Sequence, residues 1–181
     1  KELLISLIAF ISLVLFNAGK TNAQGLAIGD WRIHLPYNDV ECLAETPDKI
    51  FVASEKGLYS YHKNNGEIAY YSRVNGFSDL EPRIVRYYAP GRLVIIAYQN
   101  TNIDILKDGF VINISDILRK TILGVKEIND INIYGNLAYI SCSFGVVVLD
   151  LDRFEIKESF LNLGGVNLSI NATARYNDTL F

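Results

Sequence analysis

A repeat of about 44 residues constrains the fold of this chain more than any other feature of its sequence. Residues 50–61 (IFVASEKGLYSY) consist of a continuous apolar run, a polar turn and an alternating segment, and residues 93–106 and 138–150 repeat this order. A strand-like segment precedes each copy and another follows it, so each unit has four strands. Four-stranded units at a period of roughly 40–50 residues are typical of β-propeller blades. We therefore predict an all-β fold, a β-propeller of four-stranded antiparallel blades.

The turn inside each copy carries a small residue at an equivalent position. Gly57, Asn102 and Gly145 are separated by 45 and 43 residues. Glycine and asparagine tolerate a positive φ better than other residues, and hairpin turns often require one. We predict a positive φ at all three positions.

The apolar pattern also predicts which strands are buried. The second strand of a blade packs against neighbouring blades on both faces, and residues 50–53 and 93–97 are continuous apolar runs of that kind. Residues 155–160 (EIKESF) alternate and carry charges, as expected of an exposed outer strand. Helical periodicity is limited to a possible turn at 116–120, which excludes a parallel α/β fold. A β-sandwich would not repeat at a fixed period.

The repeat also predicts the domain organisation. A fourth unit begins at Leu168 and its pattern continues to Phe181. We interpret residues 42–181 as the first three blades and the start of the fourth blade. Propellers close with about 4–8 blades. We therefore expect this sequence to be an incomplete fragment of a longer propeller.

The N-terminus has the features of a secretory signal peptide. Residues 3–16 (LLISLIAFISLVLF) form an apolar run that follows Lys1 and precedes a polar segment with small residues. The run is shorter than the roughly 20 residues of a membrane-spanning helix. We predict a signal peptide over 1–23, cleaved between Ala23 and Gln24, and an exported protein. An uncleaved N-terminal anchor is the alternative.

Composition and charge exclude some partners. Eleven Tyr and nine Phe in a chain that is 50% hydrophobic favour strands. Removal of residues 1–23 changes the formal net charge from −3 to −4. Nucleic-acid binding requires a clustered basic surface, which the scattered Lys and Arg do not provide. Cys42 and Cys142 fall in different repeats, and we expect two small buried side chains rather than a disulfide.

No set of residues predicts catalysis. The sequence contains no nucleotide-binding or nucleophile motif. His34 and His62 lack neighbours at metal-ligand spacing, so we predict neither a metal nor a cofactor. Asp150 and Asp152 lie next to Arg153, and we expect them at a solvated hairpin end. A propeller hydrolase or lyase would need clustered acids or a histidine-based pair, so we predict that the protein is not an enzyme.

Two segments carry a family resemblance. The lead-in segment, 24–41, contains WRIHLPY, and residues 74–85 read VNGFSDLEPRIV. Together they resemble the N-terminal β-propellers of the PorZ family, surface components of the type IX secretion system of Bacteroidota. The resemblance extends over essentially all of residues 24–181. The NGFSD turn alone is also similar to propeller repeats in the sensor part of hybrid two-component regulators.

The resemblance implies a fold and a function. It implies a seven-bladed propeller in a non-catalytic protein of the outer membrane and cell surface. Such a protein is expected to present anionic lipopolysaccharide to the cell-surface sortase, together with outer-membrane components of the attachment complex. The alternative is a periplasmic glycan-sensing propeller of a hybrid two-component regulator, which accounts for the repeats and the signal peptide but not for WRIHLPY.

Aromatic residues near turns are the candidate binding residues. Their rings could stack on a sugar, since the loops of a propeller form rigid platforms. The alternative role of these rings is packing between blades. The candidates are Trp31, Tyr37, Tyr61, Phe77 and Tyr98.

Overall fold

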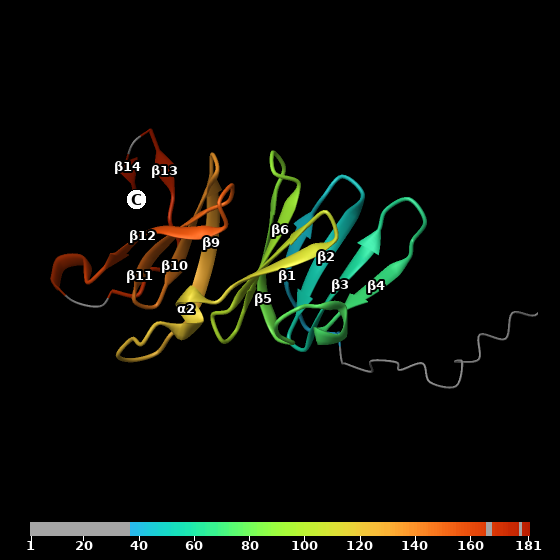
Figure 1. Cartoon of the computed structure of the whole chain (residues 1–181), viewed down its shortest axis with the longest axis horizontal. Helices are drawn as coiled ribbons and strands as arrows, with labels where there is room; N and C mark the ends of the chain where they lie inside the picture. Colours follow the sequence, from blue (N-terminus) through green and yellow to red (C-terminus); the bar gives the residue numbers. More distant parts are fainter. Residues whose placement is uncertain (1–36, 166–167, 178) are drawn as a thin grey trace, which may run out of the picture. The chain divides into compact units, whose positions relative to one another are not determined.

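The structure, a computed structural model, describes residues 37–165, 168–177 and 179–181. These residues form three four-stranded antiparallel sheets and one two-stranded pair (Figure 1). The predicted fold class, all-β with four-stranded antiparallel blades, is confirmed. The predicted signal peptide, Trp31 and His34 lie outside the described residues, and the predicted domain boundaries remain predictions.

Each four-stranded sheet is a meander in which every strand pairs with the next one along the chain. The first sheet contains β1 (Val40–Glu45), β2 (Lys49–Ser54), β3 (Gly57–His62) and β4 (Ile68–Tyr71). The second contains β5 (Pro82–Tyr88), β6 (Leu93–Tyr98), β7 (Ile103–Lys107) and β8 (Phe110–Ile114). The third contains β9 (Ile128–Tyr134), β10 (Leu137–Cys142), β11 (Gly145–Asp150) and β12 (Glu155–Leu161). The remaining elements are β13 (Arg175–Tyr176), β14 (Thr179–Leu180), η1 (Arg73–Asn75), α2 (Asp116–Arg119) and η2 (Leu163–Gly165).

Burial within a sheet follows the predicted gradient. Every residue of β6 is buried, whereas β12 has no buried residue. A strand with neighbouring sheets on both faces must be apolar along its whole length, while an outer strand meets water and uses charged side chains to protect its edge. The continuous apolar runs therefore identified the second strands correctly.

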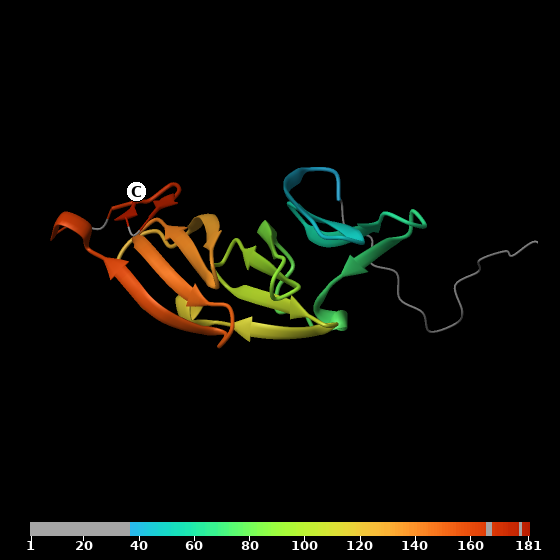
Figure 2. The same ribbon diagram turned by 90° about the horizontal axis from the view of Figure 1, so that it is seen from above.

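The three sheets pack face to face along the chain. The first strands contact one another, β1 with β5 and β5 with β9, and Figure 2 shows the sheets in succession from above. One apolar core fills the space between the first and second sheets, and a larger one fills the space between the second and third. The far face of the third sheet packs against Ile170 and Leu180.

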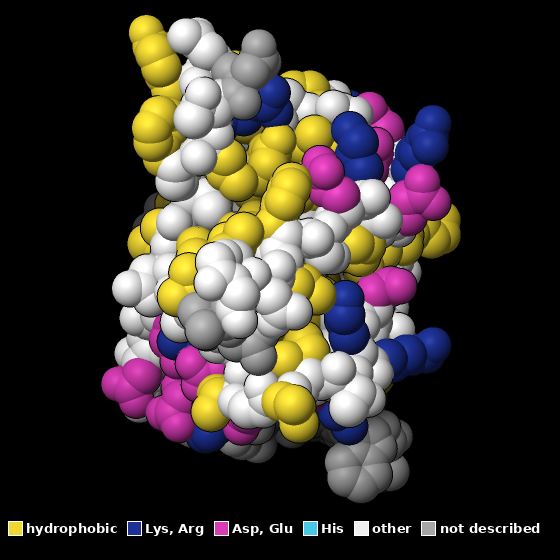
Figure 3. Space-filling model, turned by 90° about the vertical axis from the view of Figure 1, so that its left-hand side faces the viewer, with side chains coloured by type: hydrophobic (Ala, Val, Ile, Leu, Met, Phe, Trp, Pro, Cys, Tyr) yellow, Lys and Arg dark blue, Asp and Glu magenta, His cyan; other side chains and the backbone are white. Residues whose placement is uncertain are grey.

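The last described segment leaves several apolar side chains exposed. Figure 3 views the molecule from the side of the third sheet and the strand pair β13–β14, where hydrophobic side chains lie among charged ones. The more exposed ones include Leu168, Tyr176 and Phe181.

The hairpin turns agree with the predicted positive φ at one position only. Gly145 has φ 136°, as predicted. In the second sheet the positive φ falls on Thr101 (φ 71°) rather than Asn102, because this hairpin has a three-residue loop whose last residue is left-handed. Gly57 has no positive φ. A side chain there would clash with the ring of Tyr37, so its glycine serves a close approach.

Arg86 on β5 joins the inner strands of all three sheets. Its Nη2 forms an ion pair with Asp130 on β9 at 2.6 Å, and its Nε donates to the Ile131 carbonyl at 2.9 Å. Its Nη1 lies 3.0 Å from Cys42 Sγ on β1. Because both the carboxylate and the guanidinium are only partly exposed, solvent screens this pair less than it would screen a surface pair.

A buried carboxylate fixes the connection between the first and second sheets. Asp104 on β7 is fully buried and accepts four hydrogen bonds. Two come from Ser78 in the connection, from its backbone N and its Oγ, each at 2.7 Å. The others come from Tyr98 Oη at 2.8 Å and Asn113 Nδ2 at 2.9 Å. Burial and the Asp104 charge raise the pKa of Tyr98, which keeps its hydroxyl a donor.

We expect Asp104→Asn to destabilise the fold. The amide would turn an NH2 group toward donors that now share a carboxylate. A buried donor left without an acceptor costs about 1–3 kcal/mol. Urea denaturation would measure the free energy of unfolding. Asp108→Asn is the matched control, because Asp108 is exposed and has φ 49°, a conformation that asparagine tolerates. Equal midpoints for the two variants would contradict the role of Asp104.

The two cysteines are free thiols in different environments. Cys142 is buried in the core between the second and third sheets, whereas Cys42 is partly exposed. The prediction of two buried side chains therefore holds fully for Cys142 only. Burial raises the pKa of Cys142 to about 12.

This pKa predicts that Cys142 resists thiol reagents. At pH 8 only about one thiol in ten thousand would be ionised at this position, and the thiolate is the reactive form. In a Cys42→Ser variant at pH 8, we expect a disulfide reagent to modify Cys142 only after the protein is unfolded in denaturant. Rapid labelling of the folded variant would show that Cys142 is accessible.

Candidate functional site

One side of the sheets carries all connections from one sheet to the next. We call it the connection face; it includes η1 and α2, toward the lower side of Figure 1. The turn between the second and third strands of each sheet lies on this face too. In each sheet, a backbone N–H of this turn donates a hydrogen bond to the carbonyl of the residue just before the first strand. These bonds are Glu55 N to Asp39 O, Gln99 N to Glu81 O and Ser143 N to Glu127 O, at 2.9–3.0 Å.

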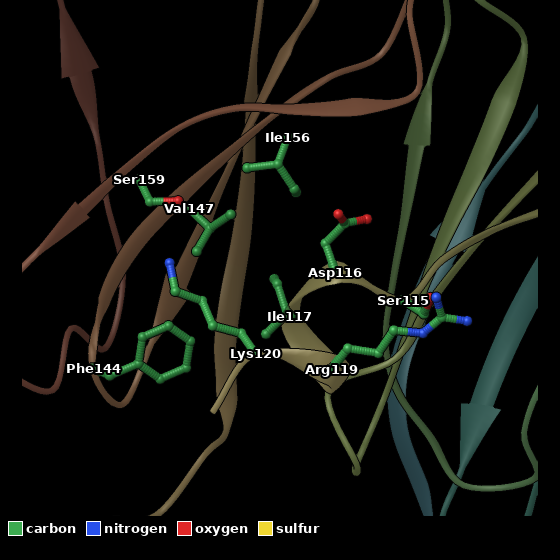
Figure 4. Close-up of a pocket in the computed structure, with 9 residues that line it drawn as sticks. All are labelled: Ser115, Asp116, Ile117, Arg119, Lys120, Phe144, Val147, Ile156 and Ser159. Atoms are coloured by element: carbon green, nitrogen blue, oxygen red, sulfur yellow. The ribbon is translucent and has the colours of Figure 1, made fainter. Parts of the chain in front are cut away.

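A groove on the connection face lies between the third sheet and the connection that contains α2. Its main part is a pocket of about 430 Å³, and an adjoining pocket of about 260 Å³ shares Lys120 and Phe144 with it. We call the two together the α2 groove. The main part is shown in Figure 4 and is lined by Ser115, Asp116, Ile117, Arg119, Lys120, Phe144, Val147, Ile156 and Ser159.

The single turn of α2 explains how these side chains reach the groove. Ile117 faces the core and is buried, which anchors the turn. The residues on either side of it, Asp116, Arg119 and Lys120, are then left at the surface. The turn is closed by backbone bonds from Arg119 N to Ser115 O at 2.9 Å and from Lys120 N to Asp116 O at 3.0 Å.

The α2 groove combines an apolar floor with a charged rim. Phe144, Val147 and Ile156 form the floor, and in Figure 4 the ammonium of Lys120 extends over it toward Ser159. Among the described residues, neither Lys120 nor Arg119 forms an ion pair. Such cations are available to an anionic group, while the floor suits the apolar face of a ligand.

A second hollow of about 430 Å³ lies where the first strands begin. We call it the acidic pocket; its lining includes Arg83 and four carboxylates, from Glu41, Glu55, Glu81 and Glu127. Nearby, Lys56 pairs with Glu55 at 2.9 Å and with Glu81 at 3.2 Å, and these hydrogen bonds raise the pKa of Lys56. Within the described residues, no group of three or more His, Cys, Asp or Glu is arranged to hold a metal.

The predicted binding residues do not lie together. Tyr37 packs on the first sheet with its ring centroid 4.7 Å from that of Tyr70 and 5.5 Å from that of Tyr59. Burial raises the pKa of Tyr37. Tyr61 lies on β3 and is 42% exposed. Of the described candidates, Tyr61 is the one most open to a ligand.

Phe77 and Tyr98 lie in the core between the first and second sheets. Phe77 is 5% exposed and packs against Tyr71 at a centroid distance of 5.2 Å, and Tyr98 is 2% exposed. Neither presents a ring to solvent in this structure. Trp31, the remaining candidate, lies outside the described residues.

The predicted hairpin role of Asp150 is confirmed. Its Oδ1 accepts from the backbone N of Asp152 at 2.9 Å and of Arg153 at 3.1 Å, and these bonds lower the pKa of Asp150. Asp152 accepts from Asn136 at 2.8 Å. Both carboxylates therefore shape a turn. His62 is half-buried at the end of β3.

Sequence reasoning missed the α2 groove and the Asp104 network. Residues 116–120 (DILRK) were predicted only as a turn, although two adjacent cations beside an apolar residue are an available signal. Asp104 is also detectable, because it is an acidic residue between two isoleucines in a predicted strand. A carboxylate at such a position needs several buried donors.

Solved structures resemble this fold at different levels. PorZ from Porphyromonas gingivalis, described as an essential bacterial surface component of the type IX secretion system, matches with a TM-score of 0.75 and 30% identity. The match covers 84% of this chain and 20% of that chain, so this chain spans about a fifth of the length of that PorZ. A search of curated proteins gave no match.

Two other structures share the fold alone. The extracellular domain of a hybrid two-component system from B. thetaiotaomicron matches with a TM-score of 0.59 and 16% identity, covering 74% of this chain and 18% of that one. The computationally designed Ika4 protein matches with a TM-score of 0.60 and 8% identity, covering 82% and 87%.

The family comparison is specific. The model of the PorZ N-terminal β-propeller domain of the type IX secretion system matches residues 50–181, which is most of the chain. The match begins after WRIHLPY, so it rests on the blades rather than on the lead-in segment. The chain therefore belongs to the PorZ N-terminal β-propeller family of the type IX secretion system.

Proposed function

We propose that this chain is the N-terminal propeller of a non-catalytic binding and scaffold component of the type IX secretion system. In this proposal the protein is exported to the outer membrane and cell surface. There it holds an anionic lipopolysaccharide and presents it to the sortase of the attachment complex. Family membership supports the setting, since the P. gingivalis relative is described as a surface component of that system. Among the described residues, no helix is long and apolar enough to cross a membrane.

The observation that carries the binding role is the α2 groove. Lys120 and Arg119 form no ion pair within the described residues, and they stand beside an apolar floor that can accept the carbon face of a sugar ring. The anionic groups of a lipopolysaccharide would complement these cations. Ser115 and Ser159 add hydroxyl groups that can hydrogen-bond a polysaccharide.

The alternative, a glycan-sensing propeller of a two-component regulator, has weaker support. The likeness to the B. thetaiotaomicron extracellular domain is at 16% identity and concerns the fold alone. The groove cations favour an anionic ligand in either setting, so the two proposals differ in the partner and not in the groove chemistry.

Charge reversal in the groove tests the binding proposal. We expect Lys120→Glu in the full-length protein to weaken binding of purified anionic lipopolysaccharide about tenfold, or about 1.4 kcal/mol. The loss arises because an attraction is replaced by a repulsion, and it should shrink as salt screens the exposed charges. Calorimetry or surface-immobilised binding would measure the Kd.

Lys157→Glu is the matched control. It makes the same charge change on the exposed strand β12, at a position that does not line the α2 groove. Equal weakening by both variants would mean that net charge rather than the groove governs binding. Unchanged binding by Lys120→Glu would reject the groove as the site.

A further inference from the structure

Exposed aliphatic side chains stand on two successive connections of the connection face. Val74 in η1 is 88% exposed, and Leu123 and Val125 in the loop after α2 are 90% and 68% exposed. Single exposed apolar residues are common on soluble proteins. Here Leu123 and Val125 are separated by one residue, and Val74 stands on the preceding connection of the same face, so the exposed aliphatic groups recur on that face.

Local contacts hold these side chains outward. At η1 the hydroxyl of Ser72 accepts from Val74 N at 3.3 Å, and Arg73 pairs with Asp79 at 3.1 Å. Rather than collapsing inward, the turn is fixed with its valine in solvent.

The loop after α2 is closed at its base. Lys126 Nζ donates to the carbonyls of Leu118 at 2.6 Å and Lys120 at 3.1 Å, which ties the end of the loop to α2. Gly124, with φ 99°, makes the reversal between Leu123 and Val125. A preformed loop loses less conformational entropy on binding than a flexible one.

The acidic pocket on the same face selects the kind of group that can meet it. The acidic pocket holds four glutamates, and Arg83 and Lys56 offset only part of their charge. The pocket repels an anionic surface, whereas Arg119 and Lys120 at the α2 groove attract one, so the face as a whole does not suit a uniformly anionic membrane. A protein that carries lysine or arginine would be attracted, and complementary charges guide association as well as orientation.

We infer that the connection face is a docking surface for a protein with apolar depressions and basic side chains. Val74, Leu123 and Val125 fill the depressions, and the acidic pocket receives a lysine or arginine of the partner. The inference rests on the proposed function and deepens it. Leu123 also lines the smaller part of the α2 groove, so a docked partner adjoins a ligand held there.

The test uses the full-length protein and the purified cell-surface sortase of the proposed function. We expect Val74→Ser/Val125→Ser to weaken their binding at least tenfold, because two apolar anchors are lost. Neither residue lines the α2 groove, so lipopolysaccharide binding should stay unchanged. Phe110→Ser is the control: Phe110 is 76% exposed at the start of β8, on the turn side opposite the connection face.

A second variant tests the charge. Glu81→Lys/Glu127→Lys should slow association with the sortase and reduce the dependence of the association rate on salt. Unaltered association would overturn the role of the acidic pocket.

The outcomes separate the two proposals. Sortase binding that survives Val74→Ser/Val125→Ser overturns the docking surface and leaves the proposed function standing. Absence of sortase binding by the wild-type protein overturns both. Binding of the wild-type protein to phosphatidylglycerol vesicles that the valine variant loses would assign the apolar tips to a membrane and also overturn the inference. Loss of sortase binding in that variant alone, with Phe110→Ser unaffected, supports it.

Discussion

The buried carboxylate of Asp104 is the constraint on which the joint between the first two sheets depends. A charge removed from water must find donors at close range, and here Ser78, Tyr98 and Asn113 supply them. Two of the four bonds come from the connection itself, so burial of the charge and the path of the chain are satisfied together. The neighbouring Phe77 enters the apolar core at the same point. The NGFSD segment therefore holds the first and second sheets together, through the hydrogen bonds of Ser78 and the packing of Phe77.

Much of the fold follows from local pattern, and the exceptions have physical causes. Continuous apolar runs predicted the buried second strands because a strand that is buried on both faces requires apolar side chains at every position. The prediction of a positive φ at Asn102 was wrong because one extra loop residue moves the left-handed position to Thr101. The spacing between repeats does not reveal this extra residue. Gly57 matched the pattern for another reason, since Tyr37 lies against it.

The candidate site was less predictable because it depends on residues from the α2 connection and from the third sheet, which are far apart in sequence. Lys120 and Ser159 are 39 positions apart in sequence and meet only when the third sheet packs on the second. Aromatic composition led to Phe77 and Tyr98, yet a large ring next to a turn is as well suited to filling a core as to meeting a sugar. Exposure separates the two roles, and it follows from packing rather than from residue type.

The connections between sheets serve two purposes at once. Their buried residues, such as Phe77 and Ile117, join one sheet to the next, which leaves the tips free to carry side chains with no structural role. The tips carry cations beside the α2 groove and aliphatic groups at Val74 and Leu123, and the same face also carries the acidic pocket. A ligand in the groove and a protein that contacts Leu123 would then be neighbours, because Leu123 also lines the groove. In the proposed function, the ligand would then be presented to the partner because the two sites are adjacent.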